Sequence, residues 1–277
     1  MGCKRRSPAQ LARLWLSSFS DARNGAERLT TTRQFVVFVG YPRSGHGLVA
    51  SLLDAHPDAL VAHELDALRF AELPFSRGQI LALVAANSRE FSDRGRAWSG
   101  FDYAVPGSWQ GRIREPLVLG DKKGARTARR LQGNAKLLSQ LSRILAMDVR
   151  VIHCIRNPFD TLGARSRRAP RTDPDRLIDA QLGLYRAVAA LDAAGTLGQS
   201  VLIRHEEFVG DPRTQLGRLC DALGLPSDDD HLDAAARIVF TAPVRSRVHF
   251  PWTPARVALV DETIRAVPAL SGYRYDD

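Results

Sequence analysis

The segment VVFVGYPRSGHGLVASLLDAHPD, from Val36 to Asp58, carries residues suited to holding a phosphate group. An apolar run leads into a short turn that contains glycines, Arg43 and Ser44, and a helical pattern follows directly. Backbone N–H groups at the start of a helix bind phosphate, an arginine adds a forked cation, and a serine adds a hydroxyl donor. The expected anion-binding residues are Arg43, Ser44, Gly45, His46, Gly47 and Leu48.

This loop differs from that of the nucleotide triphosphatases. Their pattern is G-x-x-x-x-G-K-[ST], in which the lysine reaches the phosphates and the hydroxyl residue binds magnesium. Gly40 and Gly45 have the required separation, but His46 and Gly47 stand where the lysine and the hydroxyl residue belong. The loop is therefore poorly equipped for a magnesium-bound triphosphate. A plain strand-to-helix turn, in which the glycines serve only the bend, is the alternative interpretation.

Strand and helix patterns alternate along the rest of the chain. Apolar runs predict buried strands at 35–39 and 60–61 and within 116–123, 147–158 and 199–208. Helical patterns occupy 47–55, 134–146 and 176–194. The alternation predicts a P-loop-like α/β fold, with a doubly wound, mainly parallel sheet flanked by helices in a single domain. We expect residues 1–33 to be a polar N-terminal extension and residues 34–277 to be the α/β domain.

Polar residues follow several strands, at the edge where a doubly wound sheet binds its ligands. Glu64 comes just after the second strand, Lys122 stands near the end of the third, and Arg156 follows the fourth. We expect these side chains to share a site with the loop. Plainer interpretations are a helix cap for Glu64, a solvated strand end for Lys122 and a structural ion pair for Arg156.

Charge and composition narrow the classes of partner. The chain of 277 residues has a formal net charge of +9, so an anionic partner is expected. Its basic residues are not interleaved with aromatic residues, as they are in a single-strand binding groove. A small polyanion held by several loops explains the charge as well as nucleic acid does. Charge alone does not choose between them.

Several classes of site lack their usual sequence signals. No apolar run approaches the roughly 20 residues that cross a bilayer. Arg13 interrupts the mildly apolar patch near the start and no convincing cleavage site follows, so we expect a cytoplasmic protein. Cys3, Cys154 and Cys220 have no CxxC spacing, and the histidines form no HxH or HExxH pattern. We therefore expect neither a disulfide framework nor a metal site.

Four motifs, in this order, resemble segments of the sulfotransferases that use 3′-phosphoadenosine 5′-phosphosulfate (PAPS). YPRSGHG is similar to their Y-P-[KR]-S-G-T phosphosulfate loop, and its LLDAHPD continuation is closer to the tyrosylprotein and bacterial branches than to the cytosolic steroid and phenol enzymes. VIHCIRNPFDTLGARSRR resembles the segment that grips the 3′-phosphate, and VLIRHEEF with the following GLP resembles a later family segment. The tail from Trp252 to Tyr273 is similar to the family's ending. The resemblance covers most of residues 34–274.

The resemblance implies in-line transfer of a sulfuryl group from PAPS, as co-substrate, to a hydroxyl or amine acceptor, without a metal. It implies that Arg43 stabilises the leaving phosphate and that Glu64 is the general base. Lys122 would be a second cation at the transferred group, and Arg156 would bind the 3′-phosphate. His63 is a reserve base, which we expect to point away from Glu64 because side chains alternate along an extended segment.

The chain departs from the family pattern at three positions. His46 replaces the usual threonine, His205 replaces a tyrosine, and Ala164 stands where a serine usually binds the 3′-phosphate. Ser166 is the candidate replacement for that serine. A late basic loop would close over the nucleotide through Arg245, Ser246 and Arg247.

Two other functions stay open. The first is a P-loop-like kinase or other phosphoryl-transfer enzyme, which the residues after Gly45 disfavour. The second is a catalytically inactive nucleotide-binding module, which the departures from the family pattern favour. No nucleic-acid partner and no membrane span are expected. The acceptor and the oligomeric state are left open.

Overall fold

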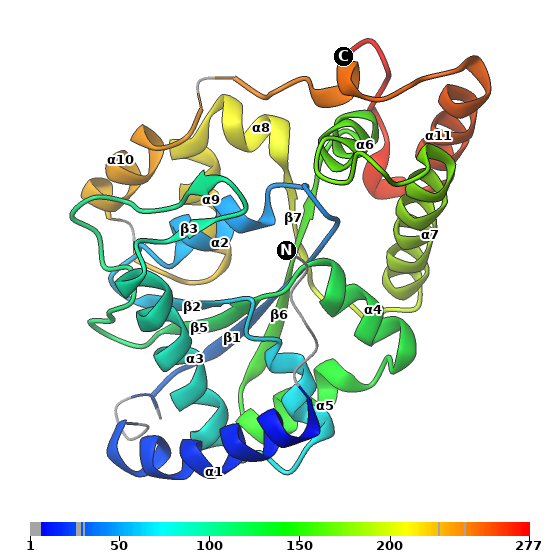
Figure 1. The fold of residues 1–277 in the computed structure, drawn as a ribbon. Coiled ribbons are helices and arrows are strands. Elements are labelled where there is room, and N and C mark those ends of the chain that lie inside the picture. Colours follow the sequence, from blue (N-terminus) through cyan, green and yellow to red (C-terminus); the bar gives the residue numbers. More distant parts are fainter. Residues whose placement is uncertain (1–6, 26–28, 30, 227, 241) are drawn as a thin grey trace.

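The computed structural model describes residues 7–25, 29, 31–226, 228–240 and 242–277. Within them, the largest sheet has five parallel strands in the order β2-β5-β1-β6-β7 (Figure 1). Their bounds are β1 (Gln34–Gly40), β2 (Ala59–His63), β5 (Val118–Lys122), β6 (Asp148–Ile155) and β7 (Val201–Arg204). The expected doubly wound parallel sheet is thus confirmed, and every expected strand overlaps an observed one.

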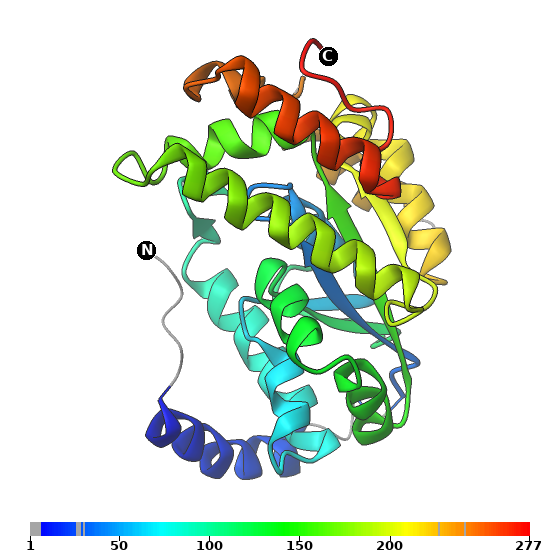
Figure 2. The same cartoon turned by 90° about the vertical axis from the view of Figure 1, so that its right-hand side faces the viewer.

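Helices cover both faces of this sheet. The α-helices are α1 (Pro8–Gly25), α2 (His46–Leu53), α3 (Arg77–Asp93), α4 (Ala125–Gly133), α5 (Leu137–Leu145), α6 (Pro158–Ser166), α7 (Pro174–Ala193), α8 (His205–Gly210), α9 (Pro212–Ala222), α10 (Asp229–Arg237) and α11 (Pro254–Ala266). Short 3-10 helices are η2 (Ala67–Glu72), η3 (Ser246–His249) and η4 (Pro268–Leu270). Helices α2 and α8–α10 lie on one side of the sheet, and α6, α7 and α11 lie on the other (Figures 1 and 2).

The side chains of β1 explain why its sequence is continuously apolar. Phe35, Val37 and Val39 belong to the core cluster that includes residues of α3 to α7 and α11. Val36 and Phe38 belong to the second cluster, which α2 and α8–α10 complete. Because successive side chains of a strand point to opposite faces, both faces of β1 are buried.

The carboxyl ends of the parallel strands bring the expected site residues to one edge of the sheet. Strand β1 lies between β5 and β6, and its end at Gly40 leads into the loop before α2. Ligands of doubly wound sheets bind at this kind of position, where the connections diverge to either side. The fold therefore places the loop beside the ends of β2, β5, β6 and β7.

The N-terminal helix α1 packs against α3. Leu11 is buried in the core cluster, and the Trp15 indole Nε1 donates to the Pro74 carbonyl at 2.8 Å. The proposed boundary between an extension and the α/β domain at residue 33 stays a prediction. Among the described helices, none has the length and apolar character needed to cross a bilayer.

A short antiparallel hairpin, β3 (Ala97–Trp98) with β4 (Phe101–Asp102), was not expected from the sequence. Arg96, just before it, forms a buried ion pair with Asp54 at the end of α2, with 2.8 Å between Nη1 and Oδ2. The Ser88 hydroxyl of α3 also donates to Asp54. The ion pair therefore fastens the start of the hairpin to α2.

Replacing Arg96 by leucine should leave the Asp54 carboxylate buried without its cation. We expect the free energy of unfolding, measured by denaturant titration, to fall by about 3–5 kcal/mol. Arg94→Leu is the matched control, because Arg94 forms an exposed ion pair with Glu90, and it should cost less than about 1 kcal/mol. Equal losses in the two variants would contradict the anchoring role of the buried pair.

Candidate active site

The loop before α2 presents backbone donors that no described residue uses. Arg43 and Gly45 both have left-handed backbone conformations, with φ of 73° and 86°. The amides of Gly45, His46 and Gly47 donate to no acceptor among the described residues, and α2 has no side-chain cap. Free N–H groups at the positive end of a helix bind an anion.

The Ser44 side chain stabilises this loop through contacts within the loop. Its hydroxyl accepts a hydrogen bond from the Tyr41 amide at 3.2 Å and lies 3.2 Å from His46 Nδ1. The side chain is buried, so the hydroxyl is already committed to holding the turn. The geometry thus gives Ser44 a supporting position and leaves the backbone amides as the available donors.

His205 packs against the loop at Gly45. A methyl group added at Gly45 would lie 2.4 Å from His205 Nδ1, so the ring leaves no room for a side chain there. Burial, and then the positive charge of Arg156, lower the pKa of His205 to about 3. The imidazole is therefore neutral near pH 7, and it supports the loop without adding charge.

Three other guanidinium groups act on that of Arg43. Burial lowers the pKa of Arg43, and the charges of Arg168, Arg156 and Arg167 lower it further. Arg156 Nη1 lies 3.4 Å from the Arg43 carbonyl oxygen, so the two residues meet at the loop. Within the described residues neither Arg43 nor Arg156 forms an ion pair, and the Nε atom of each is buried without a partner. Such a group of cations favours a bound anion.

Arg156 also contacts the segment that follows α10. Its Nη2 atom donates to the Val244 carbonyl and lies 3.5 Å from the Ser246 hydroxyl. Arg247 faces a different partner, because its guanidinium forms a buried ion pair with Asp160 of α6, with 2.7 Å between Nη2 and Oδ2. The structure thus brings Ser246 to Arg156 and commits Arg247 to Asp160.

Other candidates for the 3′-phosphate lie near this segment. Ser166 is half-buried in the last turn of α6, and Arg245 is exposed. The segment rests on α6 at Gly163, where an added methyl group would lie 2.0 Å from the Ser246 carbonyl oxygen. Their proposed roles at the nucleotide stay predictions.

Glu64 lies between two lysines at the ends of β2 and β5. Its Oε1 atom is 2.8 Å from Lys122 Nζ, and its Oε2 atom is 2.9 Å from Lys123 Nζ. Burial acts to raise the pKa of Glu64, but the two ammonium groups outweigh burial and lower it to about 2. Burial lowers the pKa of Lys122, although Glu64 opposes the shift. Glu64 is therefore ionised at neutral pH.

His63 lies in the same cluster, against the expectation that it points away from Glu64. Its Nε2 atom is 3.3 Å from Lys122 Nζ, and its ring stacks on Phe91 with 3.9 Å between the centroids. The alternation of an extended strand ends at His63, because Glu64 adopts a left-handed φ of 61°. Burial, and then Lys122, lower the pKa of His63 to about 2, so the ring is neutral.

His46 connects the loop with the Glu64 cluster. A methyl group added at Gly124 would lie 2.6 Å from His46 Nε2, so the ring reaches the turn that follows Lys122 and Lys123. Burial, and then the charge of Lys122, lower the pKa of His46 to about 4, although Glu64 opposes the shift. The anion loop and the carboxylate therefore belong to one site.

The hairpin contributes residues that sequence reasoning missed. Arg43 lies over the Phe101 ring, 4.8 Å from its centroid, and Arg168 donates to the Ser99 carbonyl. The sequence carried no signal for these contacts, since hairpin residues show no clear period. Lys123 was also missed, although the pair of lysines after an apolar strand could have indicated two partners for Glu64.

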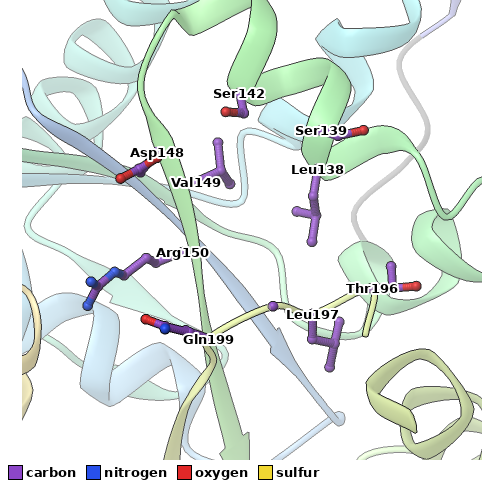
Figure 3. Close-up of a pocket in the computed structure, with 10 residues that line it drawn as sticks. Leu138, Ser139, Ser142, Asp148, Val149, Arg150, Thr196, Leu197 and Gln199 are labelled. Carbon is purple, nitrogen blue, oxygen red and sulfur yellow. The ribbon is translucent and has the colours of Figure 1, made fainter. Parts of the chain in front are cut away.

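A separate pocket of about 330 Å³ opens at the opposite edge of the sheet (Figure 3). Asp148 and Arg150 project from one side of β6 at its beginning, and Val149 projects from the other. Leu138 and Leu197 also line this pocket. Because the loop follows the carboxyl ends of the strands, this pocket is not part of the candidate site.

Comparison with known proteins identifies the family. The family model described as "Sulfotransferase family" matches residues 35–230. The chain belongs to the sulfotransferase family. No curated protein sequence matches it.

Solved structures show the same fold. Sulfotransferase STF9 from Mycobacterium avium is 12% identical, with a TM-score of 0.50, and the alignment covers 95% of this chain and 86% of that one. Sulfotransferase STF1 from Mycobacterium tuberculosis is 14% identical, with a TM-score of 0.50, and the alignment covers 95% and 83% of the two chains. At these identities the likeness concerns the fold alone. In the part of this sulfotransferase-family chain that the structure describes, no group of three or more His, Cys, Asp or Glu residues could hold a metal.

The ion pairs of Glu64 predict a specific pH dependence of stability. Its pKa falls from an ordinary 4.5 to about 2 on folding, so the stabilisation is complete above about pH 4.5 and is lost as the pH falls toward 2. In denaturant unfolding, the stability of the wild type relative to Glu64→Gln should fall by about 2 kcal/mol between about pH 6 and pH 3. Glu262→Gln, which removes an exposed carboxylate, is the matched control for the substitution. A constant difference for Glu64→Gln would show that the lysines do not hold the carboxylate.

Proposed function

We propose that the protein transfers a sulfuryl group from PAPS to a hydroxyl or amine acceptor. The observation that supports this most strongly is the group of arginines around the free amides of the loop. Arg43 and Arg156 have no ion pair in the described structure, and each has a buried Nε atom without a partner. A donor with a 5′-phosphosulfate and a 3′-phosphate supplies anions for both.

Different residues would bind different parts of PAPS. The amides of Gly45, His46 and Gly47 would hold the 5′-phosphate, as helix N-termini do. Arg156, with Ser246 beside it, would hold the 3′-phosphate. Arg43 would hydrogen-bond the oxygen that bridges phosphorus and sulfur. Preorganised donors of this kind stabilise the charge that develops on a leaving group.

The reaction needs one bond to form, one to break and one proton to move. The acceptor oxygen or nitrogen attacks sulfur, and the bond from sulfur to the bridging oxygen breaks. The electron pair of that bond remains on the phosphate, where Arg43 offsets the charge. Glu64 takes the acceptor proton, and Lys122 neutralises the oxygens of the sulfuryl group in transfer.

Glu64 must become a better base than its ion pairs allow. With a pKa of about 2, the carboxylate is a weak proton acceptor while both lysines hold it. An anionic donor attracts the Lys122 ammonium away from Glu64, because the two anions compete for one cation. Loss of that ion pair raises the pKa of Glu64 when the donor is present.

Donor binding tests the proposal directly. Adenosine 3′,5′-bisphosphate (PAP) should bind in calorimetry, and ATP with magnesium should not, because His46 and Gly47 replace the lysine and the hydroxyl residue of a triphosphatase. Arg156→Ala should weaken PAP by about 10- to 100-fold and weaken AMP, which lacks the 3′-phosphate, far less. Arg143→Ala, which removes an exposed arginine of α5 that has no proposed role at the nucleotide, is a comparison variant for net charge. Binding of ATP with magnesium alone would favour a phosphoryl-transfer enzyme.

Removal of the base should separate turnover from binding. Acceptors are first screened with labelled PAPS, and Glu64→Gln is then compared with the wild type on the best acceptor. We expect turnover to fall by about 10²- to 10⁴-fold, the usual effect of losing a positioned base, while PAP affinity changes by less than about fivefold. Unchanged turnover would assign the base to another residue, with His63 the nearest. Binding of PAP without turnover on any acceptor would favour an inactive module.

A further inference from the structure

Tyr103, just after the hairpin, covers the start of α2. A methyl group added at Gly47 would lie 3.0 Å from the Tyr103 hydroxyl oxygen and 3.3 Å from Cζ. The phenol is half-buried. Burial raises the pKa of Tyr103, which Arg43 lowers and Glu64 raises, so the ring lies within electrostatic reach of both residues. The hydroxyl therefore stands beside the loop amides and remains protonated, which makes it a hydrogen-bond donor.

The backbone of Tyr103 is fastened to the helix that it covers. Its carbonyl oxygen accepts from the Ser51 hydroxyl at 3.1 Å and from Gln110 Nε2 at 2.9 Å. Its amide donates to the Arg96 carbonyl at 3.3 Å. Ser51 is a residue of α2, and Arg96 is held to the end of α2 by the ion pair with Asp54. The position of the phenol over Gly47 is therefore set by several hydrogen bonds.

Gly47 is the position at which phosphate-binding loops of the triphosphatase type carry a serine or threonine hydroxyl. The Tyr103 hydroxyl stands where that side chain would extend. We propose that Tyr103 supplies, from outside the loop, a hydroxyl donor to the 5′-phosphate beside position 47, where the loop itself has no hydroxyl. This assignment rests on the proposed function, since it names a further binding residue for the same nucleotide. The phenol also leaves little room for a side chain at position 47.

The first test removes the hydroxyl and keeps the ring. PAP is the probe, because it carries the 5′-phosphate and needs no acceptor, and affinity is measured by calorimetry. Tyr103→Phe should weaken PAP by about 10- to 100-fold, the usual effect of losing a hydrogen bond to a charged group. Tyr275→Phe removes a phenol hydroxyl elsewhere and should change affinity by less than about twofold. Wild-type affinity in Tyr103→Phe would overturn the assignment.

The second test moves the hydroxyl back into the loop. Gly47→Ser in the wild type should weaken PAP, since the new side chain meets the phenol at Tyr103. In the Tyr103→Ala background, the same Gly47→Ser change should strengthen PAP by about tenfold, because the space is open and the hydroxyl is restored. The effect of Gly47→Ser on PAP affinity thus has opposite signs in the two backgrounds. Sites that act independently do not show such a coupling. Weakening in both backgrounds would overturn the proposal.

The outcomes separate this inference from the proposed function. If the wild type fails to bind PAP, the nucleotide assignment itself is wrong and Tyr103 loses its ligand. If the wild type binds PAP and Tyr103→Phe binds equally well, the donor assignment stands and the role of Tyr103 is wrong. Thermal unfolding of each variant without ligand is the folding control: with an unchanged midpoint, a loss of affinity reports the missing hydroxyl.

Discussion

The burial of guanidinium groups without ion pairs at one corner of the sheet is the constraint on which the site depends. Arg43 and Arg156 are withdrawn from water and lack ion pairs in the described structure, and Arg168 lies beside them. The fold holds Arg156 and Arg168 through main-chain carbonyl oxygens. Carbonyl oxygens satisfy hydrogen bonds without cancelling charge, so the corner keeps a positive potential that an anion relieves.

A carboxylate lies next to this corner, and lysines hold it in its ionised form. Glu64 is a single carboxylate held by Lys122 and Lys123, and the ring of His46 reaches from the loop to the turn that follows these lysines. The arginines and the Glu64 carboxylate therefore lie in neighbouring groups, and no ion pair joins Glu64 to Arg43 or Arg156 in the described structure. For the proposed sulfuryl transfer, this separation would let one site receive negative charge on the leaving group and a proton from the acceptor.

The sheet could be predicted from sequence because both faces of β1 are buried, which makes its apolar run continuous. The hairpin could not be predicted from the sequence, because its position depends on the ion pair of Arg96 with Asp54, which lies far away in the sequence. The candidate site residues at the strand ends could be predicted from their positions after the apolar runs. The directions of their side chains could not. The left-handed turn at Glu64 brings His63 into the site, and the side chain of Arg247 is taken up inside the protein.

The segment that follows α10 comes from a late part of the chain. It rests on α6 at Gly163, where only a hydrogen fits beneath the Ser246 carbonyl, and it contacts Arg156 through Val244 and Ser246. These residues lie beyond residue 230, where the family match ends. Since chains are made from the N-terminus, the loop and Glu64 emerge from the ribosome well before this segment does. A nascent or C-terminally truncated chain thus lacks the contacts of Val244 and Ser246 with Arg156. The side of the site that this segment covers is complete only when synthesis ends.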